Sequence, residues 1–189
     1  GMWVEADCNL ISGESMVRQL IHGKNFFSDE FGIEVDNLWL PDVFGYSAAL
    51  PQILKKSGVN YFLTQKLSWS QFNEFPHHTF NWRGIDGTEI LTHFPPENTY
   101  NSELDTQFLV PAQDHFKEKA YLDEFISLFG VGDGGGGPKP ENIELGRRMA
   151  SLESSPKVSF DTAKNFFDRL NKHKDKVDTW VGELYLELH

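Results

Sequence analysis

The sequence predicts an α/β domain built around a mainly parallel sheet. Short apolar runs, as expected of buried strands, alternate along the chain with longer segments whose apolar residues recur at helical spacing. No internal repeat and no linker divides the 189 residues, a length that suits one compact domain. We therefore expect residues 1–189 to form a single domain.

The first half of the chain contains clear helix and turn signals. Apolar residues at helical spacing follow Ser12, a preferred N-cap residue, and predict a helix over 12–27. A second helix is expected over 48–56, where Gly58 provides the C-terminal stop. Short apolar runs predict strands at 37–40, 61–64, 80–83 and 89–94. The turn dipeptide Asp86-Gly87 joins the last two strands.

The second half begins with a polar, irregular stretch over 98–107. Helical periodicity then predicts helices at 112–121, 140–152 and 161–170. Apolar runs between these helices predict strands at 125–129 and 158–160, and the alternating pattern of 179–188 predicts an extended segment.

Composition excludes several classes of partner. Lys and Arg number 17 against 28 Asp and Glu, and the net charge of −11 argues against nucleic acid, whose binding requires neutralisation of phosphates. Cys8 is the only cysteine, so we expect neither a disulfide nor a thiolate-rich zinc site, and a reducing, cytoplasmic location. No apolar stretch reaches the length of a membrane span, and no membrane partner is expected.

Asp42 is the most informative candidate site residue. It ends the apolar run 37–40, and the carboxyl ends of parallel strands are where ligands and catalytic groups collect. With Pro41 before it and Phe44 two residues beyond, Asp42 is a candidate nucleophile or metal ligand. The alternative is an N-cap for the helix that follows.

A glycine-rich segment at 130–138 surrounds a second acid, Asp133. Its spacing satisfies the G-x-G-x-x-G pattern of dinucleotide-binding turns, but the match is weak because Pro138 removes an amide where the helix should begin. Glycines also allow close approach of a substrate to the backbone. If Asp133 lies at a strand end, it can converge with Asp42, and paired carboxylates are the machinery of glycoside hydrolysis.

Motifs in one order run almost end to end along the chain: Trp3-Val4-Glu5, Gly13-Glu14-Ser15-Met16-Val17-Arg18-Gln19, Leu38-Trp39-Leu40-Pro41-Asp42, Leu63-Thr64-Gln65-Lys66-Leu67-Ser68-Trp69, Phe75-Pro76-His77-His78-Thr79-Phe80, His93-Phe94-Pro95-Pro96, Gly132 to Pro138, and Trp180-Val181-Gly182-Glu183-Leu184. Together these motifs resemble glycoside hydrolase family 38, the retaining α-mannosidases, and most of all its cytosolic branch. The likeness is weakest over 98–124.

The resemblance implies a zinc-dependent enzyme, with Co²⁺ as the alternative metal, that cleaves α-linked mannose from oligosaccharides. It implies that Asp42 is both nucleophile and zinc ligand and that His189 is a second ligand. Carboxylate and imidazole are ordinary zinc ligands. Asp133 becomes the candidate general acid/base, although other branches of the family carry a further acid where this chain has Gly134.

Three further residues are expected to contact the substrate. Phe44 would pack against the sugar ring, while Lys66 and His93 lie where the resemblance implies polar contacts. Each polar residue has a structural alternative: Lys66 as an exposed strand terminus, and His93 as a strand-end histidine whose hydrogen bonds are satisfied internally.

The chain also departs from the family pattern. The family's remaining zinc ligands form a His-x-Asp motif on the first strand of a (β/α)7-type barrel, and the only such pattern here, His173-Lys174-Asp175, lies in a lysine-rich segment. We therefore expect an incomplete barrel that lacks its first strand or strands, binds zinc weakly and is inactive alone. Its open sheet edges invite a homo-oligomer. The alternatives are a metal-dependent carbohydrate deacetylase and a non-catalytic sugar- or nucleotide-binding module.

Overall fold

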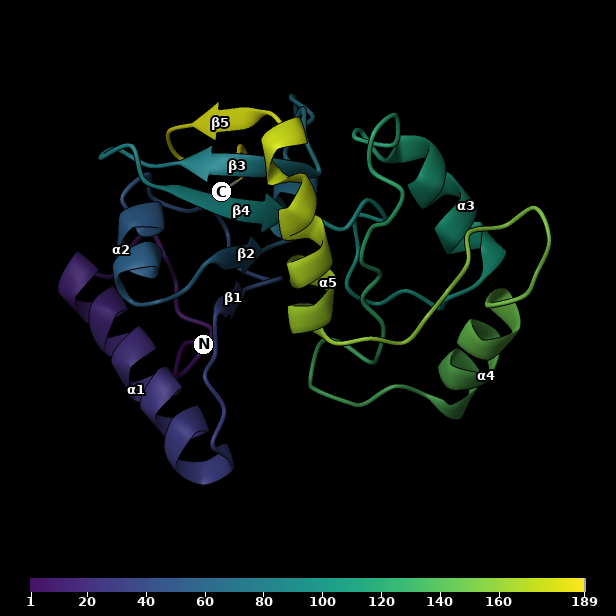
Figure 1. The fold of residues 1–189 in the computed structure, drawn as a ribbon, viewed down its shortest axis with the longest axis horizontal. Helices are drawn as coiled ribbons and strands as arrows, with labels where there is room; N and C mark the ends of the chain where they lie inside the picture. The colour runs from purple at the N-terminus through teal and green to yellow at the C-terminus, as the bar shows by residue number, and fades with distance from the viewer. Residues whose placement is uncertain (189) are drawn as a thin grey trace.

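A computed structural model of the protein describes residues 1–188 (Figure 1). Its centre is a single sheet in the order β1-β2-β4-β3-β5. The strands are β1 (Asn37–Trp39), β2 (Tyr61–Leu63), β3 (Thr79–Arg83), β4 (Glu89–His93) and β5 (Thr179–Val181). The strands β1, β2 and β4 run parallel, with Trp39 opposite Leu63 and Leu63 opposite His93. The mainly parallel α/β sheet that the sequence predicts is confirmed for these three strands.

The hairpin is also confirmed. Strands β3 and β4 pair antiparallel, and β5 joins the outer side of β3 in parallel. The turn closes with a hydrogen bond from the Gly84 amide to the Thr88 carbonyl at 2.9 Å. Gly87 adopts a φ of 84°, a conformation that glycine reaches without steric cost.

The helices are α1 (Gly13–Phe31), α2 (Leu50–Lys56), α3 (Thr106–His115), α4 (Pro140–Met149) and α5 (Ala163–Leu170), with 3₁₀ turns η1 (Lys66–Trp69) and η2 (Asn171–Lys176). The predicted start of α1 is confirmed, because the Ser12 side chain accepts a hydrogen bond from the Ser15 amide. No helix in residues 1–188 is both long enough and apolar enough to cross a membrane.

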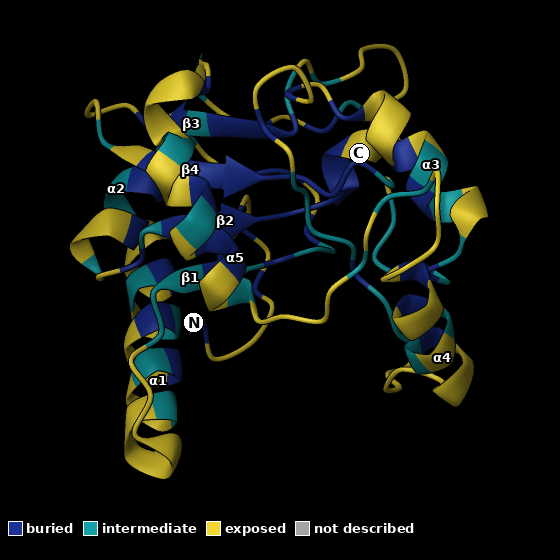
Figure 2. Cartoon of the chain, turned by 45° about the vertical axis from the view of Figure 1, so that its right-hand side comes forward, coloured by how far each residue is buried: buried dark blue, intermediate teal, exposed yellow. Residues whose placement is uncertain are grey.

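Helices cover both faces of the sheet. One core joins α1 and α2 to the sheet through Leu20, Leu54 and Phe62, and a second core joins α5 to the opposite face through Phe167 and Leu63. Because successive residues of a strand point to opposite faces, the neighbouring Phe62 and Leu63 enter different cores. Strands β2, β3 and β4 are accordingly mostly buried (Figure 2), whereas the edge strand β5 is largely exposed.

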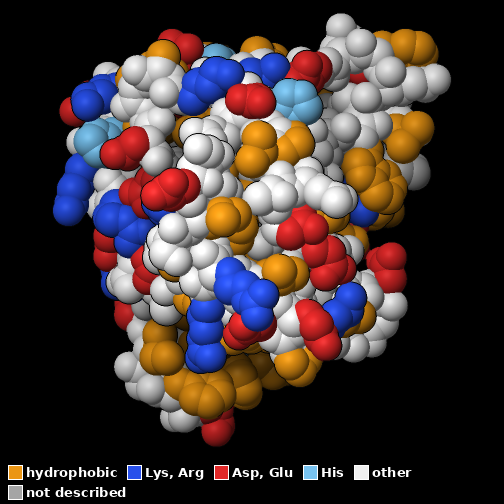
Figure 3. Space-filling view, turned by 90° about the vertical axis from the view of Figure 1, so that its right-hand side faces the viewer, with side chains coloured by type: hydrophobic (Ala, Val, Ile, Leu, Met, Phe, Trp, Pro, Cys, Tyr) orange, Lys and Arg blue, Asp and Glu red, His pale blue; other side chains and the backbone are white. Residues whose placement is uncertain are grey.

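Helices α3 and α4 lie to one side of the sheet (Figure 1). Acidic and basic side chains are interspersed on the face that they present, with hydrophobic side chains between them (Figure 3). Helix α3 begins at Thr106, earlier than the helix predicted over 112–121. It begins there because the Asp105 side chain caps it, accepting hydrogen bonds from the backbone amides of Gln107 and Phe108. The prediction missed this cap within the polar stretch.

The sheet does not close into a barrel within residues 1–188, where β1 and β5 form its two edges. The strands predicted at 125–129 and 158–160 are wrong, since both segments are irregular apart from an isolated bridge between Ser102 and Phe129. The Ile126 amide donates to a ring nitrogen of His93 rather than to a neighbouring strand. Over the described residues the sheet is open with helices on both faces, and the incomplete barrel expected from the sequence stays a prediction.

A buried carboxylate fastens the segment after α3 to the sheet. The Glu118 side chain is 1% exposed and accepts the amide hydrogens of His78, at 3.2 Å, and Thr79, at 3.0 Å, where β3 begins. The His77 imidazole lies 3.7 Å away. Burial raises the pKa of Glu118 to about 7, against the lowering effect of the two amide donors. Glu118 is therefore a carboxyl group that titrates near neutrality inside the fold.

We expect the ionisation of Glu118 to lower stability as pH rises from about 4.5 to about 7. In this window the unfolded chain has released the proton while the folded chain still holds it, so raising the pH favours unfolding. The expected loss is on the order of 2–3 kcal/mol, and Glu118→Gln should abolish it because an amide does not titrate. Urea unfolding of both proteins across this range measures the slope; equal slopes would contradict the prediction.

Candidate active site

Asp42 lies in the loop that follows β1, at the carboxyl end of the parallel strands. Its Oδ1 is 2.7 Å from the Lys66 ammonium, and its Oδ2 accepts a hydrogen bond from the Tyr100 hydroxyl at 3.1 Å. Its backbone amide donates to the carboxylate of Glu5 at 2.9 Å. The Asp42 carboxylate is thus held from two sides, by a cation and by a hydroxyl group.

A buried tyrosine fixes this loop. The Tyr46 hydroxyl donates to the carbonyls of Leu40, at 2.9 Å, and Val43, at 3.0 Å, on either side of Asp42. The Tyr46 ring packs edge-on against Phe62 of β2, with the ring centroids 4.9 Å apart. The position of Asp42 therefore depends on the core beneath α1 and α2 as well as on its own contacts.

Lys66 is nearly inaccessible although it is charged. Its side chain is 4% exposed, and its ammonium lies 3.4 Å from the centre of the Trp69 ring and 5.5 and 5.3 Å from those of Phe44 and Tyr100. A desolvated ammonium needs such compensation, which the Asp42 carboxylate and the ring faces provide. The alternative of an exposed strand terminus does not describe Lys66 in this structure.

Tyr100 connects Asp42 to the glycine-rich loop. A Cβ atom on Gly132 would lie 2.9 Å from the Tyr100 ring and 2.6 Å from the Asn101 side chain, so only glycine fits against this pair. Asp133 follows with a φ of 48°, in the left-handed region, and is exposed. Partial burial, the hydrogen bond to Asp42 and the charges of Asp42 and Asp133 raise the pKa of Tyr100 to about 12. The loop that carries Asp133 therefore packs against the tyrosine that bonds Asp42.

Phe44 and His93, the other residues expected to contact the substrate, differ in their exposure to solvent. Phe44 is 38% exposed beside Lys66. His93 is fully buried: its Nδ1 is 2.9 Å from the Thr79 hydroxyl, and its Nε2 accepts the Ile126 amide at 3.3 Å. Burial lowers its pKa well below the usual range, so the ring is neutral with both nitrogens engaged inside the chain. His189 lies outside the described residues.

The described residues do not by themselves fit a zinc ion. No group of three or more His, Cys, Asp or Glu side chains within 1–188 is arranged to hold a metal. Asp42 Oδ2 accepts the Tyr100 hydrogen bond, and Oδ1, which is buried without a hydrogen bond, lies 2.7 Å from the Lys66 ammonium, with which a metal there would compete. A zinc site that included Asp42 would need donors from outside residues 1–188.

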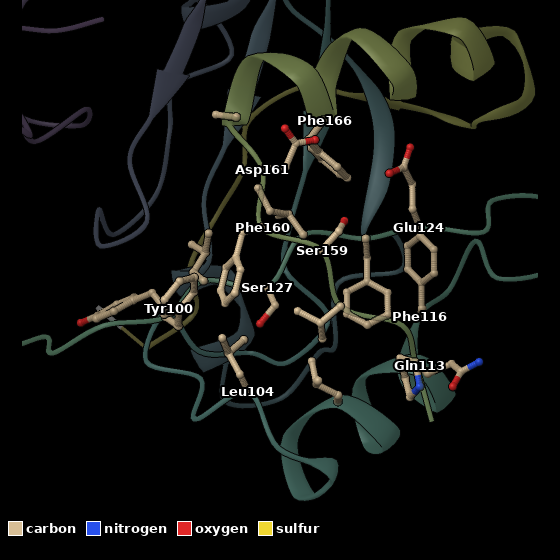
Figure 4. A pocket seen from close by; sticks show the side chains of 18 of the residues that line it. Tyr100, Leu104, Gln113, Phe116, Glu124, Ser127, Ser159, Phe160, Asp161 and Phe166 are labelled. Atoms are coloured by element: carbon tan, nitrogen blue, oxygen red, sulfur yellow. The ribbon is translucent and has the colours of Figure 1, made fainter. Parts of the chain in front are cut away.

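A large cavity adjoins the site. It has a volume of about 1700 Å³, and its wall includes Pro41, Tyr100 and Gly132, although Asp42 and Lys66 do not line it. Figure 4 shows the rings of Phe116, Phe160 and Phe166 directed into it from different elements. The candidate site thus lies at the rim of a space lined by aromatic and aliphatic side chains together with charged ones such as Glu124, Asp161 and Arg169.

Sequence reasoning missed two residues of this site. Tyr100 falls in the stretch predicted to be irregular, and nothing in its local pattern indicates a contact with Asp42, 58 residues earlier. Trp69 belongs to one of the family motifs, but the sequence alone predicts no role for it. Its position three residues after Lys66, which places both side chains on one turn of η1, could have indicated a contact between them.

The chain matches the model of the glycosyl hydrolases family 38 N-terminal domain over residues 1–183. It is 49% identical to Alpha-mannosidase G of Dictyostelium discoideum and 46% identical to human Alpha-mannosidase 2C1, in each case over all 189 residues. It spans only 17% and 18% of the lengths of these relatives.

Among solved structures, the fold resembles that of an alpha-mannosidase from Enterococcus faecalis with a TM-score of 0.71 and 19% sequence identity. That match covers 97% of this chain and 21% of the other. A 4-alpha-glucanotransferase from Thermococcus litoralis matches less closely, with a TM-score of 0.56, 15% identity, and coverage of 89% of this chain and 28% of the other. From the family model and the relatives together, the chain belongs to glycosyl hydrolase family 38, as part of its N-terminal domain.

Proposed function

We propose that this chain is a portion of a retaining α-mannosidase that acts on mannose-containing oligosaccharides. The observation that carries the proposal is the Asp42 carboxylate, fixed by Lys66 and Tyr100 at the carboxyl end of β1. The loop that carries Asp133 packs against the same tyrosine. The names of the family relatives agree with this substrate class.

In the proposed reaction, an Asp42 oxygen attacks the anomeric carbon of mannose as the bond to the leaving oxygen breaks. Asp133 donates its proton to that leaving oxygen, and a covalent glycosyl–Asp42 ester remains. Asp133 then takes a proton from water, which attacks the same carbon and releases Asp42. The Lys66 ammonium pairs with Asp42 Oδ1, and the Tyr100 hydroxyl donates to Oδ2, so together they fix the orientation of the attacking carboxylate.

Zinc, or cobalt in its place, is part of the proposal but not of a complete site in this chain. We propose Asp42 and His189 as two of its ligands, with the others supplied by polypeptide outside this sequence. Two ligands are rarely enough for a tight site, so affinity for the metal should be weak in this chain alone. His93 takes a structural role in this proposal, since its ring nitrogens are already bonded.

An assay of two proteins tests this function. Zinc titration and hydrolysis of an aryl α-mannoside are measured on this chain and on a longer form that adds a strand with the His-x-Asp motif. We expect weak zinc binding and no turnover from the chain alone, and tight binding with turnover from the longer form. Turnover by neither would defeat the assignment. Sedimentation of the same samples reports whether copies associate through the edges β1 and β5.

A further inference from the structure

Trp69 and Phe44 form an exposed aromatic surface beside Asp42. Trp69, the last residue of η1, is 47% exposed, and Phe44 lies in the loop that carries Asp42. Their ring centroids are 6.4 Å apart and the rings are inclined at 68°. Large aromatic rings left in water beside a candidate active site indicate a surface that a ligand covers.

The Lys66 ammonium fixes the position of this surface relative to Asp42. It lies 2.7 Å from Asp42 Oδ1 and 3.4 Å from the centre of the Trp69 ring. The distance from the Trp69 ring centre to Asp42 Oδ1 is therefore at most the sum of these two distances. That sum is comparable to the width of a pyranose ring. The ammonium covers one side of the indole, and the exposed fraction of Trp69 leaves the remainder open to solvent.

Polar side chains bond to the loop that carries Asp42 and Phe44. The exposed Glu5 carboxylate accepts a hydrogen bond from the Asp42 amide, and the exposed Asn9 side chain donates to the Phe44 carbonyl at 3.1 Å. Sugars present one CH-lined face and a rim of hydroxyl groups. An aromatic surface can pack on that face, and carboxylate and amide groups on the same loop offer partners for hydroxyl groups.

We propose that Trp69 binds the sugar unit next to the mannose that Asp42 attacks. The chain would then discriminate a mannose disaccharide from a single mannose through Trp69. This inference rests on the proposed function, because Asp42 defines which sugar is the neighbour. Trp69 is held for this role by the cation beneath its ring, which restricts the side chain before ligand arrives.

Calorimetric titration of the full chain with methyl α-mannoside and with a methyl α-mannobioside tests the proposal. We expect the wild-type chain to bind the disaccharide more tightly. Trp69→Ala should lower affinity for the disaccharide about tenfold and change affinity for the monosaccharide less than about twofold. Trp69→Phe, which keeps a ring, should retain most of the preference. Trp3→Ala is the matched control, since Trp3 is 56% exposed and its ring packs on Phe26 of α1.

The outcomes separate this inference from the proposed function. If the wild-type chain binds both sugars but Trp69→Ala keeps the full disaccharide preference, the role of Trp69 is overturned and the proposed function stands. Equal losses for both sugars would also overturn it, because they would indicate an effect through Lys66 on the whole site. If the wild-type chain binds neither sugar, this inference fails, while the proposed function is decided separately by turnover of the longer form.

Discussion

Asp42→Asn is expected to abolish turnover of an aryl α-mannoside by the longer, active form of the protein, with kcat reduced by a factor on the order of 10³ or more. The amide cannot form the glycosyl ester, and it also loses the charge that the buried Lys66 ammonium faces at 2.7 Å. Steady-state kinetics, with the release of aryl alcohol as readout, measures the loss.

A matched variant distinguishes loss of chemistry from loss of structure. Asp29→Asn removes a carboxylate from the exposed part of α1 and should leave kcat unchanged. Circular dichroism of Asp42→Asn should match that of the parent protein, because Asn fills the same volume. Turnover by Asp42→Asn at more than a tenth of the parent rate would rule out Asp42 as the nucleophile.

Trp82→Ala is expected to lower the free energy of unfolding by about 3–5 kcal/mol. Trp82 is fully buried in β3, with its ring 5.3 Å from that of Phe62, and its indole donates to the Gly182 carbonyl at 2.7 Å. The substitution therefore leaves a cavity in the core and also removes a contact that holds the segment after β5. Urea denaturation at constant pH measures the change.

The control for this prediction is again Trp3→Ala. The Trp3 ring packs on Phe26 at the surface, so removing that ring should change the free energy of unfolding by no more than about 0.5 kcal/mol. Similar losses from both variants would mean that β3 does not contribute to the core in the way the structure describes.

The elements that sequence predicted correctly are those with strong local rules. Helix α1 has a serine cap and a regular apolar stripe, and β3 and β4 flank a turn dipeptide, so neighbouring residues determine each structure. The position of Asp42 at a strand end follows from the same kind of local pattern. These features needed no knowledge of distant contacts.

The features that sequence could not predict depend on long-range contacts. Residues 125–129 have the composition of a strand, but whether they become one depends on a free strand edge beside them, and the Ile126 amide bonds to His93 instead. The hydrogen bond of Tyr100 to Asp42 and the burial of Lys66 between rings likewise join segments far apart in the chain. No local periodicity encodes such pairings.

The Tyr46 hydroxyl, which bonds the carbonyls of Leu40 and Val43, has a consequence for how this domain can vary over evolution. Substitutions in the layer beneath α1 and α2 must preserve both packing volume and the place of two backbone oxygens. That layer should therefore accept fewer residue types than packing volume alone would allow.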